Sequence, residues 1–473
     1  MAGFQLEELL RAMEGEIWLP SSHRSIRRLS TDSRSIRRGD GFVPLRGETY
    51  DGHQFMAQAL LKGAAGAIVE KSYRRKTLAT AHRLKRLHPS LNPWIMGVDD
   101  SLRAYQNAAG QYRKRFQIPV VAVTGSNGKT TTKEMISHIL RQRWTILKTK
   151  ANFNNCVGVP QTLLRLTARH EGAVIEMGVD RKGQTTRLCE LVQPTMGVIT
   201  NIGPDHLEFF GTLKASAQGK AELLNALSPQ GIIALNADDD FYSFLNRQAS
   251  CRVISYGWSH KADLRASEMV TGRKGTTFRL LLPSRTRAIK IFIAAHGRHN
   301  VSNALAGAAI GYALGFSASQ VARGLAEFKP APMRSQIRRV QGMTFLYDCY
   351  NANPASMKAA LAVLGDYGHT QRHIAVLGEM HELGKHAPRF HRVIGAVAAQ
   401  QGLSHLVVCG GKLAACMAEG ARKANMNIRG ISKVPDVWAA CRLLKTVLRR
   451  GDVVLLKGSR GAGMERIVEG MQA

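Results

Sequence analysis

The residues with the clearest chemistry lie in the segment IPVVAVTGSNGKTTT, at 118–132. Gly125 and Gly128 let the backbone turn tightly and direct its N–H groups toward an anion. Lys129 follows at once and can reach the terminal phosphates of a nucleotide, and Thr130 can hold a magnesium ion. These residue types in this order predict a phosphate-binding loop.

The loop is shorter than the general phosphate-loop pattern. Only Ser126 and Asn127 stand between its glycines, whereas the general pattern has four residues there. A glycine-rich turn that merely joins a strand to a helix is the alternative interpretation. The coincidence of strand, glycines, lysine, threonine and helix favours phosphate binding.

Two elements must position this loop. Val120 to Val123 form a continuous apolar run, which predicts a strand buried on both faces of a parallel sheet. After Thr130 the pattern changes period, and Met135, Ile136, Ile139 and Leu140 fall on one helical face. The loop is therefore expected at the carboxyl end of a strand and at the start of a helix.

Three further polar residues lie near predicted strand ends or helices of the same region. Glu176 ends an apolar strand and could bind magnesium or make a local hydrogen bond. His206 stands in NIGPDHLE, where an isolated histidine is often structural. Lys220 has the sequence context of an ordinary solvated helix lysine. The residues alone leave these alternatives open.

Polar loops also occur at both ends of the chain. STDSR at 30–34 and RGETYDGHQF at 46–55 could hold a base, ribose or phosphate, or could be ordinary surface loops. Asp348 at a strand end, YNANP at 350–354 and KGSRGAGME at 457–465 lie where an open sheet binds ligands. KGSRGAG lacks a following GK-T and is weak support for a second phosphate loop.

One helix start offers a further pair of candidates. His299 and Asn300 are expected in the first turn of the small-residue helix HGRHNVSNALAGAAIGYALG. Asn300 and Asn303 could also cap that helix.

Composition limits the class of protein. The chain has 473 residues with 44% hydrophobic and 21% charged residues, which predicts about three globular domains. No apolar run approaches the roughly 20 residues of a membrane span, and the acidic N-terminal segment does not resemble a signal peptide. We therefore expect a cytoplasmic protein, and the seven scattered cysteines are expected to be reduced thiols.

The net charge of +32 suggests anionic partners. The basic residues are spread along the chain, are densest at 71–86 and lack interleaved aromatic residues, which favours a solvated basic surface over a nucleic-acid site.

The pattern predicts an α/β protein of three domains, at 1–98, 99–330 and 331–473. The first is a small α/β domain, the second a central parallel sheet like that of P-loop ATPases, and the third a Rossmann-like domain. We expect a linker or surface excursion at 71–97, a helix at 101–116 and a loop at 151–164. The proline-rich segment 329–333 is expected to act as a hinge.

Taken together, these motifs resemble the Mur ligase family of ATP-dependent amide ligases. The resemblance rests on TGSNGKTTT, STDSR with FVPLRGETYDGHQF, ANFNNCVGVPQTLL, the EMG turn, DHLEFFG with GKAELL, GRHNVSNALA, YNANPASM, LGEMHELG and VLLKGSRGAGME. It covers nearly the whole chain apart from the basic stretch near 71–92. YNANP and KGSR-x-x-x-ME point to the branch that joins D-alanyl-D-alanine to UDP-N-acetylmuramoyl-tripeptide in peptidoglycan precursor synthesis.

The resemblance implies a role for each candidate residue. Catalysis would fall to Lys129, Lys220 and His206, with two magnesium ions held by Thr130, Glu176, His206 and a carbamylated Lys220. ATP would contact Gly125, Ser126, Asn127, Gly128, Lys129, Thr130, Thr131, Asn300, Arg334 and Asp348. Arg334 departs from the family's usual surroundings, because PMRSQ replaces the GR pattern. Substrate would contact Ser30, Thr31, Asp32, Arg46, Asn351 and Asn353.

The implied enzyme is a monomer without nucleic-acid partners or stable membrane insertion. Two alternatives stay open at this point. One is a nucleic-acid-dependent ATPase that uses the basic surface, and the other is a folate or other peptide ligase of the same fold.

Overall fold

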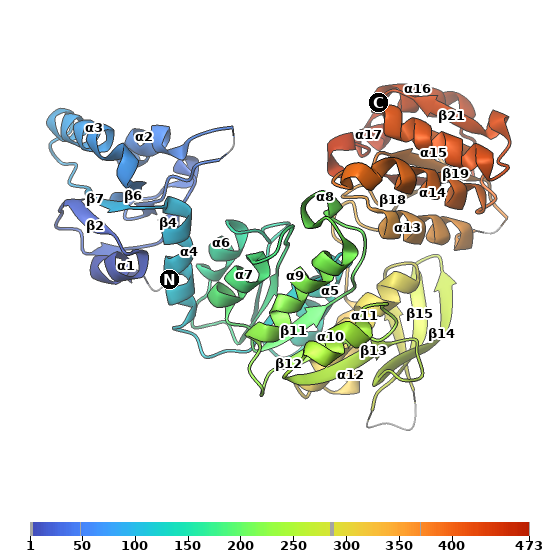
Figure 1. Ribbon diagram of the computed structural model, residues 1–473, viewed down its shortest axis with the longest axis horizontal. Helices are drawn as coiled ribbons and strands as arrows, with labels where there is room; N and C mark the ends of the chain where they lie inside the picture. The colour runs from blue at the N-terminus through green and yellow to red at the C-terminus, as the bar shows by residue number, and fades with distance from the viewer. Residues whose placement is uncertain (1–2, 48, 284–287, 369, 473) are drawn as a thin grey trace. The chain divides into compact units, whose positions relative to one another are not determined.

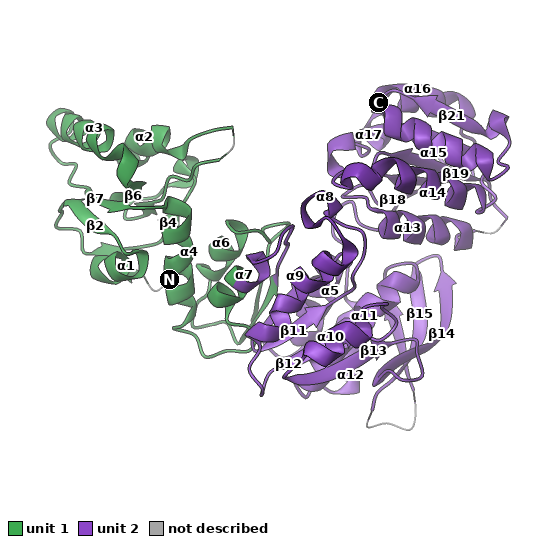
Figure 2. Ribbon diagram, viewed as in Figure 1, with its two compact units in different colours: residues 1–120, 145–175, 187–194 green, residues 121–144, 176–186, 195–473 purple. Residues whose placement is uncertain are grey.

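A computed structural model describes residues 3–47, 49–283, 288–368 and 370–472 (Figure 1). Its contacts divide the chain into two compact units (Figure 2). Unit 1 comprises residues 1–120, 145–175 and 187–194, and unit 2 comprises residues 121–144, 176–186 and 195–473.

Unit 1 contains a five-stranded sheet of order β2-β7-β6-β5-β4. Strand β2 is antiparallel to β7, and the other neighbours are parallel. A short antiparallel pair, β1 with β3, lies apart from this sheet. The strands are β1 (Phe4–Gln5), β2 (Glu16–Leu19), β3 (Ser25–Ile26), β4 (Leu29–Ser30), β5 (Gly41–Phe42), β6 (Gly66–Glu70) and β7 (Trp94–Val98).

Short and long helices accompany this sheet. They are α1 (Leu6–Met13), α2 (Met56–Leu61), α3 (Arg74–Leu87) and α4 (Ser101–Arg113), with 3-10 turns η1 (Ser33–Ser35), η2 (Gly52–Phe55) and η3 (Lys71–Tyr73). Buried side chains of α2, α3 and the sheet form one hydrophobic cluster. The helix predicted to begin at 101 is confirmed.

The predicted linker at 71–97 is wrong. Helix α3 occupies its first half, and β7, whose residues are all buried, is an interior strand of the sheet. The charge density misled the interpretation, because the basic side chains alternate with Thr77, Ala81 and Leu84, which are buried at helical spacing.

The central sheet has nine strands in the order β16-β15-β14-β13-β12-β11-β8-β10-β9. The successive pairs from β11 to β14 and the pair β11-β8 are parallel, whereas β15 is antiparallel to both of its neighbours, β14 and β16. The strands are β8 (Val120–Thr124), β9 (Ile146–Lys148), β10 (Gly172–Glu176), β11 (Met196–Ile199), β12 (Ile232–Asn236), β13 (Arg252–Gly257), β14 (Leu264–Gly272), β15 (Gly275–Leu281) and β16 (Ile289–Ile293).

The helices between these strands follow the predicted alternation with two differences. They are α5 (Lys129–Leu140), α6 (Gly158–Leu163), α7 (Gln184–Val192), α8 (Leu207–Phe210), α9 (Leu213–Ala226), α10 (Tyr242–Gln248), α11 (Arg298–Ala313) and α12 (Ala318–Ala326). Helix α6 replaces the second half of the loop expected at 151–164, because Val159, Thr162 and Leu163 are buried at helical spacing. In the turn before it, Asn155 Oδ1 accepts the backbone N–H groups of Val157 and Gly158. Helix α10 and strand β14 had no sequence prediction.

The C-terminal sheet has the order β17-β18-β22-β19-β20-β21, parallel except for β17. Alternate residues of its strands enter two hydrophobic clusters, one under α13, α14 and α15 and the other under α16 and α17. The result is a three-layer α/β domain. Its elements are β17 (Gln336–Val340), β18 (Met343–Tyr347), α13 (Pro354–Asp366), β19 (His373–Gly378), η4 (Gly384–His386), α14 (Ala387–Ala399), β20 (His405–Cys409), α15 (Lys412–Lys423), η5 (Ile428–Gly430), β21 (Ile431–Val434), α16 (Val437–Val447), β22 (Val453–Lys457), η6 (Arg460–Ala462) and α17 (Arg466–Gln472).

The structure also bears on the state of the cysteines and on membrane-spanning helices. All seven cysteines are thiols, as predicted. Among the described residues, no helix combines the length and the apolar character that crossing a bilayer requires.

Candidate active site

The loop between β8 and α5 needs both of its glycines. Gly125 has φ +134°, and a Cβ atom there would lie 2.0 Å from Thr200 Oγ1. Gly128 has φ +82°, and its Cβ would lie 2.2 Å from Asn303 Oδ1. Because a side chain is excluded at both positions, the backbone N–H groups at the start of α5 are held in a tight, reproducible turn.

The segment after β11 fixes the tip of the loop. Asn201 Oδ1 accepts the backbone N–H of Asn127 at 3.0 Å, and Asn201 Nδ2 donates to the Asn127 carbonyl at 2.9 Å. Thr200 Oγ1 donates to the same carbonyl at 2.6 Å. Sequence reasoning missed Asn201, although it follows the apolar run of β11 and strand ends are where ligand-binding side chains collect.

Lys129 bends back over the loop. Its Nζ donates to the carbonyls of Gly125 at 2.5 Å and Ser126 at 3.2 Å. Burial lowers the pKa of Lys129, an effect that the nearby carboxylate of Asp205 opposes. The ammonium therefore has backbone partners that a phosphate could replace. Thr131, another predicted contact, lies in the first turn of the same helix.

Thr130 and Glu176 meet as the sequence suggested. Thr130 Oγ1 donates to Glu176 Oε1 at 3.0 Å, and both side chains are buried. The buried ammonium of Lys133 lies 3.5 Å from the other carboxylate oxygen. This arrangement supplies hard oxygen atoms beside the phosphate loop, which suits a magnesium ion.

Asp205 connects the loop to Lys220 and was not among the predicted residues. Its Oδ1 accepts hydrogen bonds from Ser126 Oγ at 2.5 Å and from Lys220 Nζ at 3.2 Å. Lys220 is buried and also donates to Ser216 Oγ at 2.6 Å. Burial raises the pKa of Asp205, but Lys220 and Lys129 outweigh burial and the net shift is downward. The only sequence signal was its position beside His206 in PDHLE.

His206 lies in the left-handed region, with φ +50°, directly before α8. Its Nδ1 is 2.6 Å from Glu382 Oε2, and this contact lowers the pKa of Glu382. Glu382 comes from LGEMHELG, the turn after β19, so the histidine is oriented by a carboxylate of the C-terminal domain.

Asn351 and Asn353 follow β18. Asn353 caps α13 by accepting the N–H of Ser356 at 2.9 Å, and its Nδ2 donates to Asn127 Oδ1 in the phosphate loop at 2.8 Å. The carbonyl of Asn351 accepts a hydrogen bond from Lys457 Nζ at 3.0 Å. YNANP is therefore built into the wall beside the loop.

The half-buried Asp348 forms an ion pair with the buried Lys457, whose Nζ is 2.6 Å from Asp348 Oδ2. The backbone N–H of Ser335 donates to Asp348 Oδ1 at 3.0 Å. Burial raises the pKa of Asp348, but Lys457 and the N–H of Ser335 together lower it further than burial raises it. The guanidinium of Arg334, another predicted residue, stacks 4.0 Å from the ring centroid of Tyr350.

Several of these groups line a polar cleft of about 600 Å³ in unit 2. Two turns contribute a histidine each, His206 before α8 and His381 after β19. The phosphate loop and the KGSRGAG loop line the cleft as well. Its lining is Ser126, Lys129, Asp205, His206, Asn351, Ala352, Asn353, His381, Glu382, Ser459, Arg460 and Gly461.

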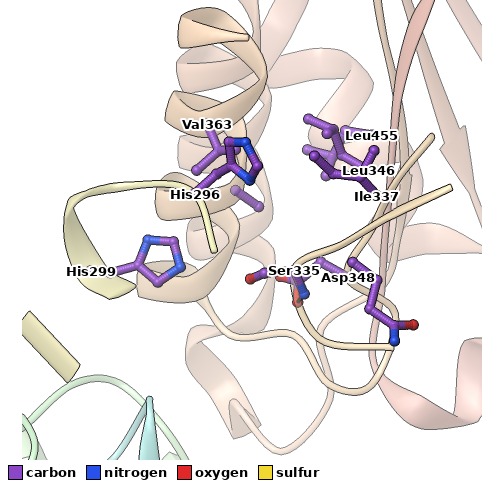
Figure 3. Close-up of a pocket in the computed structure, with 10 residues that line it drawn as sticks. His296, His299, Ser335, Ile337, Leu346, Asp348, Val363 and Leu455 are labelled. Atoms are coloured by element: carbon purple, nitrogen blue, oxygen red, sulfur yellow. Dashed lines mark hydrogen bonds between the residues drawn. The ribbon is translucent and has the colours of Figure 1, made fainter. Parts of the chain in front are cut away.

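A second, more apolar pocket of about 340 Å³ lies at the start of α11 (Figure 3). In the view of Figure 3, the lining residues His299 and Asp348 lie below Val363 and Leu346. Burial lowers the pKa of His299. Such a mixture of apolar surface and a few polar groups suits a ring system.

Asn300 is buried at the same helix start. Its Nδ2 donates to the carbonyl of His296 at 2.8 Å, and its Oδ1 accepts from Asn303 Nδ2 at 3.2 Å. The capping alternative for these two asparagines is wrong, because Gly297 holds the cap position and α11 has no side-chain cap.

The four N-terminal candidates belong to unit 1. Ser30 Oγ donates to the carbonyl of Asp32, next to Thr31. The carboxylate of Asp32 caps η1 and pairs with Arg34 at 2.9 Å. Arg46 forms a β-bridge with Asp51. Within the part of the chain that the structure describes, no three His, Cys, Asp or Glu side chains are grouped to hold a metal ion.

Three protein-family profiles match this chain. Residues 25–101 match the Mur ligase family, catalytic domain; residues 123–311 match the Mur ligase middle domain; and residues 333–460 match the Mur ligase, glutamate ligase domain.

Curated relatives cover almost the entire sequence. The UDP-N-acetylmuramoyl-tripeptide--D-alanyl-D-alanine ligase of Bacillus subtilis (strain 168) is 34% identical over 442 residues, which are 93% of this chain and 92% of the relative. The ligase of the same name from Escherichia coli (strain K12) is 32% identical over 478 residues, covering 100% of this chain and 99% of the relative.

Solved structures agree. A crystal structure of MurF from Acinetobacter baumannii has a TM-score of 0.87 at 30% identity and covers 99% of both chains. MurF ligase from Thermotoga maritima in complex with ADP has a TM-score of 0.81 at 26% identity, covering 94% of this chain and 97% of that one. The chain belongs to the Mur ligase family, and the predicted three-domain α/β class is confirmed.

Proposed function

We propose that this chain is an ATP-dependent amide ligase that joins D-alanyl-D-alanine to the terminal carboxylate of UDP-N-acetylmuramoyl-tripeptide, forming ADP and phosphate. Relatives of that name align over nearly the whole chain. The observation that carries the proposal is the shared cleft, in which the phosphate loop with Lys129 meets YNANP and KGSR.

The nucleotide would span the cleft and the pocket at the start of α11. Lys129 binds the β and γ phosphates, supported by the backbone N–H groups of 125–131. Asn300 meets the adenine, and Arg334 and Asp348 reach the nucleotide from the C-terminal domain. The apolar lining and the histidine of the second pocket support this assignment.

The donor set beside the loop suits magnesium. Thr130 and Glu176 offer a hydroxyl and a carboxylate 3.0 Å apart, both buried, and His206 is proposed to hold a second ion. When bound, magnesium neutralises charge on the transferring phosphoryl group.

Lys220 fits that donor set only as a carbamate. An ammonium 3.2 Å from Asp205 would repel a nearby metal ion, whereas a carbamylated lysine presents oxygen atoms. Lys220→Ala should therefore lose activity that small carboxylic acids partly restore. Wild-type activity in Lys220→Ala would contradict the carbamate.

The chemistry follows from the poor reactivity of a free carboxylate. The γ-phosphoryl group passes from ATP to a carboxylate oxygen, giving an acyl phosphate and ADP. The amine of D-alanyl-D-alanine then attacks the acyl carbon, an amide forms, the amine proton leaves to solvent or a base, and phosphate departs. Lys129 offsets charge on the transferring group, and the walls of the cleft exclude water.

The N-terminal domain would hold the uridine part through Ser30, Thr31, Asp32 and Arg46. We propose domain boundaries at 98/99 and 330/331 and a hinge at 329–333. Closure at this hinge would bring the reactants together. Small-angle scattering should detect compaction when an ATP analogue and the tripeptide substrate are added, and an unchanged radius of gyration would contradict the hinge.

We also propose that the enzyme acts in the cytoplasm as a monomer. Size-exclusion chromatography with light scattering should give the mass of one chain.

The function is tested by phosphate release from ATP and magnesium with UDP-N-acetylmuramoyl-tripeptide, with and without D-alanyl-D-alanine. Release should require both substrates. Release that ignores the dipeptide but responds to DNA or RNA would identify a nucleic-acid-dependent ATPase instead. Release with a folate substrate in place of the tripeptide would identify the other peptide-ligase branch.

A further inference from the structure

Helix α3 of unit 1 concentrates positive charge that the ligase reaction does not use. Between Lys71 and Val98 the sequence has seven lysines and arginines and no aspartate or glutamate. The helix is fixed to its domain because Thr77, Ala81 and Leu84 are buried, and the last two belong to the hydrophobic cluster under the five-stranded sheet.

The opposite face of α3 is exposed and basic. At 100° per residue, Arg75, Lys76, Arg83 and Arg86 point away from the buried stripe, and all four are exposed. In the described part of the chain none of these four cations forms an ion pair with an acidic side chain. Their charge is therefore available to an external partner.

Apolar side chains are also exposed on α3 and on its neighbour α2. Leu87, at the end of α3, is 67% exposed. Helix α2, which packs on the same hydrophobic cluster, ends at Leu61, 51% exposed, and is followed by Lys62. Leucine beside lysine and arginine suits the boundary between lipid headgroups and acyl chains.

The same face lacks the groups that bind nucleic acid well. Residues 74–87 contain no Phe, Tyr or Trp ring on which a base could stack, and His82 is their one aromatic side chain. A layer of phosphate headgroups requires positive charge and a shallow apolar contact. The basic face of α3 offers the charge, and Leu87 at its end offers the apolar contact.

We propose that the outward face of α3 is a peripheral binding surface for a bilayer rich in anionic phospholipid. Each cation near such a surface strengthens binding by about fivefold. The contact is electrostatic and superficial, so it weakens as salt screens the charges.

The test is co-flotation of the full-length protein with vesicles of phosphatidylglycerol and phosphatidylcholine, compared with phosphatidylcholine alone. At about 0.1 M salt the protein should bind the anionic vesicles and not the neutral ones. The triple variant Arg75→Gln, Arg83→Gln, Arg86→Gln should bind about a hundredfold more weakly.

A matched control removes the same charge elsewhere. Arg252→Gln, Arg273→Gln, Lys433→Gln takes three exposed cations from unit 2 and should keep the vesicle binding. Both triple variants should retain the wild-type melting temperature and phosphate release, because all six residues are exposed and outside the cleft.

Three results would overturn the proposal. The first is no binding of the wild-type protein to anionic vesicles, and the second is an equal loss of binding in the control triple variant. The third is tighter binding of a DNA duplex or RNA strand than of vesicles, abolished by the α3 variant, which would make this face a nucleic-acid site.

Discussion

Two lysines lie beside glycine-rich loops of unit 2, and their surroundings differ. The ammonium of Lys129 contacts only loop carbonyls, has no ion pair with a carboxylate among the described residues, and has a pKa lowered by burial. The ammonium of Lys457 lies 2.6 Å from the carboxylate of Asp348. A lysine without an acidic partner keeps its charge for an incoming phosphate, whereas a paired lysine holds two strands of the site together.

The order of residues explains this difference. In TGSNGKTTT the lysine follows the glycines and begins α5, so it projects over the loop. In KGSRGAGME the lysine precedes the glycines and ends β22, next to β18, which leads to Asp348. The two loops have similar compositions, but the position of the lysine relative to the glycines gives it a different role in each.

Replacing Lys129 should produce the largest effect on activity. Lys129→Met removes the charge that we propose binds the γ phosphate, and turnover should fall by about a thousandfold or more. Its unfolding free energy should stay near the wild-type value, because no carboxylate is left unpaired. Steady-state phosphate release and urea unfolding measure the two quantities, and a turnover within tenfold of wild type would remove Lys129 from the phosphate site.

Replacing Lys457 should instead reduce stability. Lys457→Met leaves the half-buried carboxylate of Asp348 without its partner, which should cost about 2–3 kcal/mol of unfolding free energy. The double variant Asp348→Asn, Lys457→Met should recover most of that loss, because neither charge remains. If Lys457→Met unfolds at the same urea concentration as the wild-type protein, the ion pair of Lys457 does not stabilise the fold.

The glycines of the two loops should differ as well. Gly125→Ala places a Cβ 2.0 Å from Thr200 Oγ1 at φ +134°, and should cost roughly 2–5 kcal/mol. Gly463→Ala, at φ +60° with its nearest neighbour 3.7 Å away, should cost only about 1–2 kcal/mol. Thermal unfolding of the two variants measures the difference, and equal losses would show that crowding at the first loop is relieved by movement.

The smallest effect concerns pH. The pKa of Asp348 is lowered in the folded protein, so between that value and 3.8 the unfolded chain binds more protons and stability falls as pH falls. Above this window the contribution is constant. Compared with the wild-type protein, Asp348→Asn, Lys457→Met should lose less stability between neutral pH and pH 3, as measured by urea unfolding. If the unfolding free energies of the two proteins change equally with pH, the ion pair does not contribute to the pH dependence of stability.

The sequence predicted the parts of the site that depend on local pattern. The phosphate loop, its strand and helix, and Glu176 at the end of β10 follow from an apolar run, glycines and a change of period. Asn201, Asp205 and Lys457 did not follow, because their partners lie on other strands and the register between strands sets their contacts. Helix α3 was misassigned because its buried positions are small or polar, apart from Leu84, among many charges.

The most direct test of the account is the fate of an oxygen atom. If the γ-phosphoryl group passes to the terminal carboxylate of UDP-N-acetylmuramoyl-tripeptide, substrate labelled with ¹⁸O in that carboxylate should transfer one ¹⁸O to each phosphate released during ligation with D-alanyl-D-alanine. Mass spectrometry of the phosphate measures the transfer. Phosphate without ¹⁸O, formed at the same rate as the amide product, would contradict phosphoryl transfer to the carboxylate.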